Sequence, residues 1–269
     1  MDPKEHLLLA VDISNTGIKF GVYPRDRGEL VARWRIATVR EKTSDEYAML
    51  LVDLLRHHYL RLDTIEAAIM SSVVPPLTPV FQELARQYLG REAIVVNHNT
   101  DLGIRLLVDN PWETGADRML SALAVHRLYG GPAIVIQFGT ATSFDCVSAA
   151  GDFLGGAIAP GLGISAEALT RAASRLYQVE LTPPPHAIGK NTTRSMQSGI
   201  IYGHVGLVEG LVARLRAELA PNGEAIARVI AHGGLADIMA QVTPCIDVVN
   251  PNIVLEGLRL TYERLQASQ

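Results

Sequence analysis

Apolar runs separated by short polar turns divide the chain into strands and helices. Residues 7–12 are mostly apolar, residues 13–17 form a polar turn and apolar positions alternate over residues 18–23, which predicts a strand hairpin. A helix is predicted over residues 45–58, with Ser44 as its N-cap, because apolar positions recur there at helical spacing. Further strands are predicted over residues 67–71, 93–96, 133–138, 144–148 and 228–231. Further helices are predicted over residues 78–89, 115–129, 166–176 and 254–266, and one or two helices over residues 193–220. Strands that alternate with helices indicate an α/β fold.

The hairpin at the N-terminus has a counterpart over residues 133–148, where a strand, a small polar turn and a second strand follow one another again. Aligning Asp12 with Gln137 superimposes the two polar turns. A chain of 269 residues is long enough for two hydrophobic cores. We therefore expect two duplicated lobes, an N-terminal lobe over residues 1–117 and a C-terminal lobe over residues 118–269.

Composition narrows the class of protein. Apolar residues make up 48% of the chain and charged residues 19%, as in folded proteins. The net charge of −4, without a basic run, argues against nucleic acid as a partner. The apolar run near the N-terminus ends at Asp12 and is too short for a signal peptide or a membrane span, so we expect a cytoplasmic protein without a membrane partner. Cys146 and Cys245 form no CxxC pair, and no disulfide or transition metal is expected.

Three turns rich in Gly, Ser and Thr, at residues 12–16, 139–142 and 232–235, each follow a predicted strand. Small residues let backbone N–H groups approach phosphates closely, so three such turns together favour a nucleotide site, although each one alone is more often an ordinary hairpin turn. Asp12 ends a buried strand, where a carboxylate can hold the Mg²⁺ that accompanies ATP. The alternative for Asp12 is a capped turn.

The stretch Gly115-Ala116-Asp117-Arg118 opens a predicted helix. The positive end of a helix suits an anion, Asp117 can accept a proton from a hydroxyl group, and Arg118 can bind a carboxylate or phosphate. The alternative for Asp117 is a first-turn acid that only complements the helix dipole.

Six motifs follow one another along nearly the whole chain. They are Ser-Ser-Val-Val-Pro-Pro-Leu-Thr at 71–78, Asp-Asn-Pro at 109–111, Gly-Ala-Asp-Arg at 115–118, Phe-Gly-Thr-Ala-Thr at 138–142, Leu-Gly-Gly-Ala-Ile-Ala-Pro-Gly at 154–161 and Met-Gln-Ser-Gly at 196–199. Because type III pantothenate kinases have these motifs in the same order, the sequence resembles that family. The resemblance implies two ribonuclease H-like lobes of the actin-like ATPase class with a cleft between them. It also implies ATP-dependent phosphorylation of the primary hydroxyl of pantothenate, the first step of coenzyme A biosynthesis, by a homodimer that uses Mg²⁺ and a monovalent cation (K⁺ or NH₄⁺).

The resemblance also implies roles for individual residues. Asp117 is then the general base, and the other pantothenate-binding residues are Val108, Gly115, Ala116, Arg118 and Thr192. The residues implied for the ATP phosphates are Asp12, Ser14, Asn15, Thr16 and Thr140, with Gly233 and Gly234 in the loop that holds the adenosine. Asp12 would hold Mg²⁺, directly or through water, and Gln137 stands at the position of the monovalent-cation ligand.

Four positions of the candidate site depart from the family pattern. Ser14 stands where the family has glycine, Gln137 replaces an aspartate, Val108 replaces an aromatic residue and His232 replaces a threonine. A Cβ at residue 14 would cost on the order of 1–3 kcal/mol if that position required a positive φ or a very close approach of the phosphate. These departures keep two alternatives open: a catalytically impaired homologue that binds nucleotide or pantothenate as a regulator, and a kinase for another small hydroxyl or carboxylate substrate.

Overall fold

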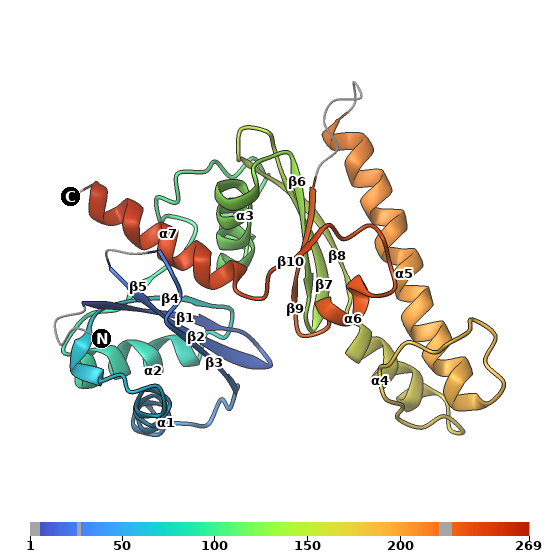
Figure 1. Cartoon of the computed structure of the whole chain (residues 1–269), viewed down its shortest axis with the longest axis horizontal. Coiled ribbons are helices and arrows are strands. Elements are labelled where there is room, and N and C mark those ends of the chain that lie inside the picture. The colour runs from blue at the N-terminus through green and yellow to red at the C-terminus, as the bar shows by residue number, and fades with distance from the viewer. Residues whose placement is uncertain (1–5, 26–27, 221–227, 269) are drawn as a thin grey trace. The chain divides into compact units, whose positions relative to one another are not determined.

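The computed structural model describes residues 6–25, 28–220 and 228–268, which form two compact units (Figure 1). Unit 1 contains the described residues within 1–103, 110–124 and 254–269, and unit 2 contains those within 104–109 and 125–253. This grouping differs from a single division after residue 117. The reason is that the closing helix packs within unit 1, whereas the short segment 104–109 packs within unit 2.

Unit 1 is built on a five-stranded sheet in the order β3-β2-β1-β4-β5. The strands are β1 (Leu7–Ile13), β2 (Gly17–Pro24), β3 (Ala32–Ala37), β4 (Ile65–Ser72) and β5 (Ile94–Val95). The hairpin β1–β2 and the pair β2–β3 are antiparallel, whereas β1–β4 and β4–β5 are parallel. Strand β1 is buried along its whole length, as expected for a central strand that is covered on both faces.

Helices cover both faces of this sheet. The helices α1 (Ser44–His57) and α2 (Leu77–Leu84) share one hydrophobic core with alternate residues of β1, while α7 (Ile253–Ala267) approaches the other face, where Leu255 lies next to Gly21. The helix α3 (Ala116–Tyr129) meets α7 closely, because a Cβ on Gly257 would lie 2.3 Å from the Leu120 carbonyl oxygen. Short helical turns complete the description at η1 (Leu62–Thr64), η2 (Ala85–Leu89) and η3 (Pro111–Glu113).

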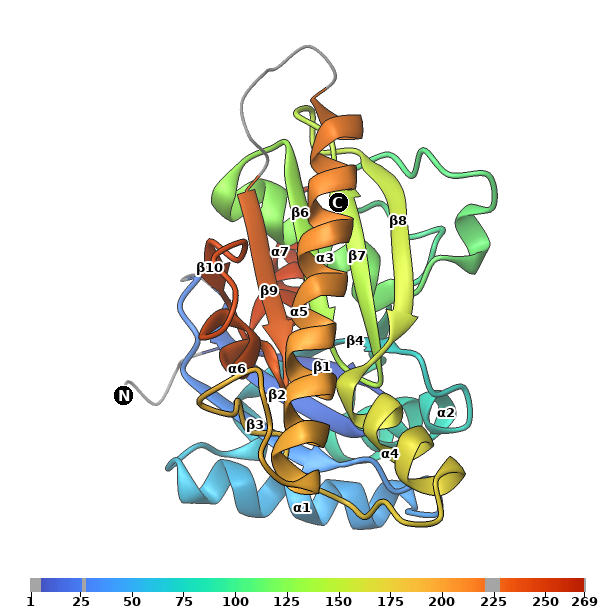
Figure 2. The same cartoon turned by 90° about the vertical axis from the view of Figure 1, so that its right-hand side faces the viewer.

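Unit 2 repeats the same sheet topology, in the order β8-β7-β6-β9-β10. Its strands are β6 (Ala133–Phe138), β7 (Ala141–Val147), β8 (Phe153–Pro160), β9 (Arg228–Gly233) and β10 (Val248–Val249), and its helices are α4 (Leu162–Ala172), α5 (Thr192–Leu219) and α6 (Ala236–Ala240). The long helix α5 runs along one face of the sheet (Figure 2), and its buried side chains join the sheet's hydrophobic core. Parallel and antiparallel pairs recur in the same positions as in unit 1, which confirms the predicted duplication.

Several elements differ from the sequence-based expectation. The strands β3, β8 and β10 and the helix α6 were not predicted. Of the one or two helices predicted over residues 193–220, the structure has one, α5. Thr43, not Ser44, is the N-cap of α1, because its hydroxyl accepts the Glu46 N–H while the Glu46 carboxylate accepts the Thr43 N–H.

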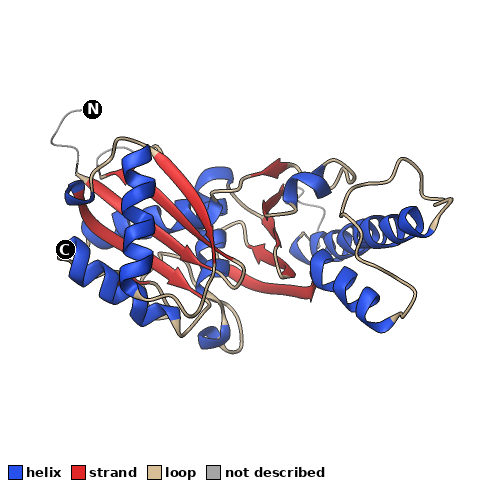
Figure 3. Cartoon of the chain, turned by 90° about the horizontal axis from the view of Figure 1, so that it is seen from below, coloured by secondary structure: helices blue, strands red, loops and turns tan. Residues whose placement is uncertain are grey.

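Figure 3 shows the strands in red with helices packed against them. Within the described residues, no helix is both long enough and apolar enough to cross a membrane.

Candidate active site

Asp12 lies near the carboxyl end of β1 and is only 3% exposed. Its carboxylate accepts hydrogen bonds from the Ser71 hydroxyl at 3.1 Å and from the Ser14 hydroxyl at 3.5 Å. Ser71 occupies the matching position of the parallel neighbour β4, and Lys19 is the residue opposite Asp12 on β2. The prediction that Asp12 ends a buried strand is confirmed, whereas sequence reasoning missed Ser71 and Lys19.

The turn after Asp12 is formed by Ser14, Asn15 and Thr16, which are half-buried or exposed. The Ser14 N–H donates to the Gly17 carbonyl oxygen at 3.1 Å and closes the turn. Among the described residues, Tyr59 is the one non-glycine residue with a positive φ, so Ser14 does not adopt the left-handed conformation that favours glycine. The backbone strain that was considered for Ser14 is therefore absent.

Asp117 is the second residue of α3 and is 8% exposed. Its Oδ1 accepts the Arg118 N–H at 3.0 Å, and a Cβ on Gly115 would lie 2.6 Å from that same oxygen. Gly115 therefore leaves the space that the Asp117 carboxylate occupies. The same Cβ would lie 3.8 Å from Val73, which directly follows β4, so the start of α3 lies near the carboxyl end of the sheet. Burial of this kind is unusual for an acid that only complements a helix dipole.

The charge of Asp117 acts on the Asp12 carboxyl group. Burial raises the pKa of Asp12 to about 6, and the negative charge of Asp117 adds to this rise, while Lys19 and the two serine hydroxyls oppose it. A buried carboxylate with hydroxyl groups around it offers the hard oxygen ligands that Mg²⁺ prefers, so these residues fit that ion. Unit 1 thus brings together the predicted residues Asp12, Ser14, Asn15, Thr16, Gly115, Ala116, Asp117 and Arg118 around the carboxyl ends of β1 and β4.

The second predicted phosphate turn joins β6 to β7 in unit 2 and carries Gly139 and the exposed Thr140. The Gly161 N–H donates to the Thr140 carbonyl oxygen at 3.1 Å. A Cβ on Gly161 would lie 2.4 Å from the carbonyl oxygens of both turn residues, so glycine is needed for this approach. Gly233 is required for a similar reason, because its φ is +104° and a Cβ there would lie 2.3 Å from the Phe138 carbonyl oxygen.

Gln137 lies in a row of residues that crosses the sheet of unit 2. His232 on β9 and Ser143 on β7 are its partners on the two neighbouring strands. His232 was predicted in a loop, but it belongs to β9 and is 1% exposed. Amide and hydroxyl oxygens can coordinate a monovalent cation, whereas this row of described residues contains no carboxylate. Gln137, His232 and Ser143 therefore form a row of polar side chains that offers a cation no negatively charged ligand.

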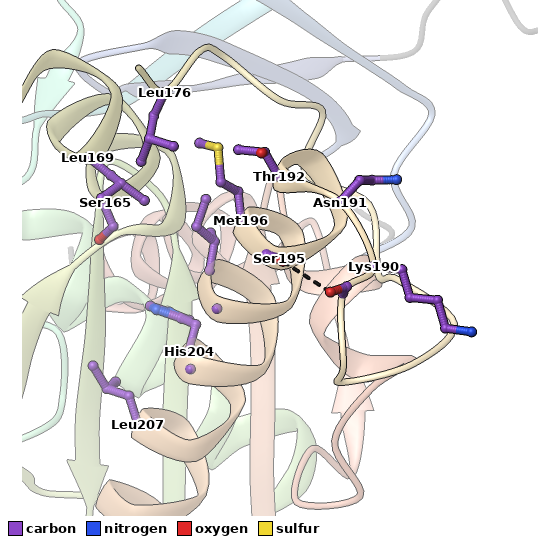
Figure 4. A pocket seen from close by; sticks show the side chains of 14 residues that line it. Ser165, Leu169, Leu176, Lys190, Asn191, Thr192, Ser195, Met196, His204 and Leu207 are labelled. Carbon is purple, nitrogen blue, oxygen red and sulfur yellow. Dashed lines mark hydrogen bonds between the residues drawn. The ribbon is translucent and has the colours of Figure 1, made fainter. Parts of the chain in front are cut away.

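Two predicted substrate residues lie elsewhere in unit 2. Thr192 begins α5 and lines a cavity of about 850 Å³ next to α4, with Lys190, Met196 and His204 also on its wall (Figure 4). The His204 imidazole is hydrogen-bonded to the buried Thr142 hydroxyl at 3.0 Å, and burial lowers its pKa.

Val108 belongs to a short segment that extends the sheet beside β8, where the Leu107 N–H donates to the Phe153 carbonyl oxygen at 2.8 Å. Arg105 holds this segment through two side-chain hydrogen bonds to Asp152, at 2.9 and 2.5 Å. The Arg105 backbone N–H adds a third bond to Asp152 at 3.3 Å. Sequence reasoning missed this pair.

Solved structures with a similar fold share little sequence with this chain. MreB 5 of Spiroplasma citri bound to AMPPNP has a TM-score of 0.53 at 10% identity, covering 99% of this chain and 98% of that one. The ethanolamine utilization protein EutJ from Carboxydothermus hydrogenoformans has a TM-score of 0.52 at 14% identity, covering 95% and 89%. Together with the repeated sheet order, these similarities confirm the predicted α/β class of two duplicated ribonuclease H-like, actin-like lobes.

Relatives in sequence are much closer. A family model described as type III pantothenate kinase matches residues 8–214. The type III pantothenate kinase of Roseiflexus sp. (strain RS-1) is 51% identical over 257 residues, which cover 96% of this chain and 98% of that protein. That of Moorella thermoacetica is 47% identical over 258 residues, which cover 96% and 99%. This chain therefore belongs to the type III pantothenate kinase family.

Proposed function

We propose that this chain transfers the terminal phosphoryl group of ATP to the primary hydroxyl of pantothenate. The observation that carries the proposal is the pair of buried carboxyl groups in unit 1, Asp12 and Asp117, which lie close enough for the charge of one to raise the pKa of the other. Pairs of titratable groups with different environments are typical of sites that need both an acid or metal ligand and a base. The membership of the family identifies the reaction.

Asp117 is the residue best placed to accept the hydroxyl proton. Its carboxylate lies at the start of α3, in the space that the missing Cβ of Gly115 leaves. The adjacent Arg118 would bind the pantothenate carboxylate through its guanidinium group. The remaining substrate contacts, from Gly115, Ala116, Val108 and Thr192, follow from the family resemblance.

The turn at residues 14–16 and the Gly139–Thr140 turn supply backbone N–H groups and hydroxyls for the phosphates, with Gly233 and Gly234 at the adenosine. Asp12 would hold the Mg²⁺, directly or through water. A bound Mg²⁺ neutralises charge on the phosphate oxygens during transfer. In unit 1, Lys19 adds a positive charge opposite Asp12.

The impaired-homologue alternative rested on Ser14 and Gln137. Ser14 adopts no left-handed conformation and donates a hydrogen bond to Asp12, so its side chain is compatible with the turn. Gln137 affects a different property, the use of a monovalent cation, because its amide brings no charge. We propose a kinase in which the requirement for K⁺ or NH₄⁺ is weak.

The deciding experiment measures ADP release from ATP, Mg²⁺ and pantothenate, in potassium and again in sodium, with Asp117→Asn as the matched variant. We expect pantothenate-dependent release in both salts and a loss of at least 100-fold in kcat for the variant, because general base catalysis contributes about 10²–10⁴-fold. Release that is equal without pantothenate, or with another hydroxy acid in its place, would favour a different acceptor. Tight binding of ATP or pantothenate without any release would favour the regulator.

We also propose that the enzyme is a cytoplasmic homodimer. Support comes from α5, where Gly199, Gly203 and Gly206 are exposed, and a Cβ on any of them would meet nothing within 4 Å. The spacing of four and three residues places the three glycines on one face of the helix. Such a face lets a second backbone approach closely.

A further inference from the structure

Three residues at the end of β3 and just beyond it contact the three residues of the first phosphate turn in unit 1. The Thr38 hydroxyl donates to the Ser14 carbonyl oxygen at 2.6 Å. The Arg40 guanidinium donates to the Asn15 side-chain oxygen at 3.3 Å, and the Arg35 guanidinium donates to the Thr16 carbonyl oxygen at 3.5 Å. Residues 35–40 therefore brace the whole turn from one side.

The strand register explains how Arg35 reaches the turn. Arg35 is the partner of Lys19 on β2, and Lys19 is the partner of Asp12 on β1, so the three side chains lie in one row across the sheet. Arg35 also lies against the backbone of Gly17, where a Cβ would be only 2.6–2.8 Å from its guanidinium group. Glycine at the start of β2 thus leaves room for the arginine next to the turn.

The charges of Arg35 and Arg40 are not matched by carboxylates. Within the described part of the chain neither residue forms an ion pair, whereas Arg61 pairs with Asp63 and Arg86 pairs with Glu83 and Glu92. Both arginines make their hydrogen bonds to neutral oxygens of the turn. The turn is therefore bordered by the positive charges of Arg35 and Arg40, which face no carboxylate among the described residues.

We propose that Arg35 and Arg40 form a cationic brace that stabilises the polyphosphate of the nucleotide through their charge while holding the phosphate turn in place. This inference rests on the proposed function, since it takes the turn to be the phosphate site. Uncompensated arginines beside backbone N–H groups raise the local positive potential, and the gain in affinity grows with the charge of the ligand. The cationic brace therefore increases the affinity for ATP more than the affinity for ADP.

Arg35→Met and Arg40→Met remove the charges and keep much of the side-chain bulk. The matched control is Arg33→Met, because Arg33 lies on the same strand two residues from Arg35 and on the same side of the sheet, but pairs with Gly21 rather than with the end of the turn. Calorimetric titration of each protein with ATP and with ADP, without pantothenate, measures the effect on binding alone. Titrations at low and high KCl measure how much of it is electrostatic.

We expect each single variant, Arg35→Met or Arg40→Met, to bind ATP about fivefold more weakly than the wild type. The double variant should bind ATP about 20-fold more weakly, the size expected for partly screened charges. The logarithm of the fold-change in affinity should be about half as large for ADP as for ATP. Arg33→Met should change the affinity for either nucleotide less than twofold. The affinity of the wild type should also fall more steeply with KCl than that of the double variant. Equal losses for ATP and ADP without a change in salt dependence, or losses no larger than that of the control, would overturn the inference.

The proposed function can fail separately. Binding of ATP that depends on the brace, without turnover of pantothenate, would support the inference and reject the proposed function. A wild type that does not bind ATP would overturn both.

Discussion

The Asp12 carboxyl is a buried ionisable group at the centre of the proposed nucleotide site. Burial raises its pKa to about 6 from the ordinary value of 3.8, so between these pH values the folded chain holds a proton that the unfolded chain lacks. Its contribution to stability is therefore complete below pH 3.8 and is lost as the pH rises through about 6. At pH 8 the ionised Asp12 destabilises the ligand-free protein.

Asp12→Asn should stabilise the ligand-free protein at pH 8 by about 1–3 kcal/mol, because a shift of roughly two pKa units corresponds to that free energy. The gain should shrink at pH 5, where the native carboxyl is mostly protonated. Urea unfolding at both pH values measures the free energy of unfolding. The same variant should lose the rise in Tm that ATP with Mg²⁺ gives the wild type, and a stability gain that is the same at both pH values would contradict this account.

Gly115 is the second single residue on which the site depends. Gly115→Ala places a Cβ 2.6 Å from Asp117 Oδ1, so the carboxylate must rotate away from its position. We expect kcat to fall at least tenfold while Tm changes little, because the atom that must move is the end of a side chain. The control is Gly163→Ala on α4, where a Cβ meets nothing within 4 Å. Equal kcat values for Gly115→Ala and wild type would remove this steric argument.

At the scale of elements, the two hairpins and the first-turn location of Asp117 could be predicted from the sequence because both depend on local patterns. The strand β8 could not be predicted in this way. Its Gly155 and Gly156 weaken any strand signal, and Gly156 is needed because a Cβ there would lie 1.6 Å from the Phe144 carbonyl oxygen on the neighbouring strand. The strand β3, in contrast, could have been predicted from the sequence, since Trp34 and Ile36 alternate with exposed arginines.

The parts of the site that the sequence could not supply depend on contacts between distant residues. Arg40 reaches Asn15 across 25 positions of the chain, and Arg105 reaches Asp152 across 47. No local pattern reports such contacts. The backbone conformation of Ser14 could not be predicted either, because the resemblance to the family gives only the residue type that its members have at that position.

The pair Arg105–Asp152 anchors the segment that carries Val108, whose Cγ1 lies 3.5 Å from the position of a Cβ on Gly155. Asp152→Asn removes the charge that binds the guanidinium and loosens this segment. We expect KM for pantothenate to rise about three- to tenfold, with KM for ATP and kcat nearly unchanged, because Val108 is a proposed pantothenate contact. Steady-state kinetics with each substrate varied in turn measures both constants.

The control for that prediction is Asp63→Asn, which breaks the similarly charged pair with Arg61 in unit 1. It should leave both KM values as they are. A change of similar size in both KM values for Asp152→Asn would indicate general destabilisation instead of a role at the pantothenate contact.

At the scale of the whole molecule, duplication gives the two sheets equivalent rows of residues with different chemistry. Unit 1 has Arg35, Lys19, Asp12 and Ser71 in its row, and unit 2 has Ile158, Ser143, Gln137 and His232 at the same positions. The topology is shared, but the row of unit 2 contains neither a carboxylate nor a lysine or arginine. The charged groups proposed for phosphate and metal therefore belong to unit 1.

Assembly is the remaining property at this scale, and α5 makes it testable. Gly203→Glu places a charged side chain on the exposed glycine face, where an added Cβ meets nothing within the chain itself, so the fold of one copy should be unaffected. If two such faces pack together, the buried charges prevent the contact. Light scattering after gel filtration should give twice the 29.1 kDa of one chain for the wild type and 29.1 kDa for the variant. Gly163→Glu on α4 should stay dimeric. A wild-type monomer would contradict the proposed homodimer, and a dimeric Gly203→Glu would show that the interface lies away from the glycine face of α5.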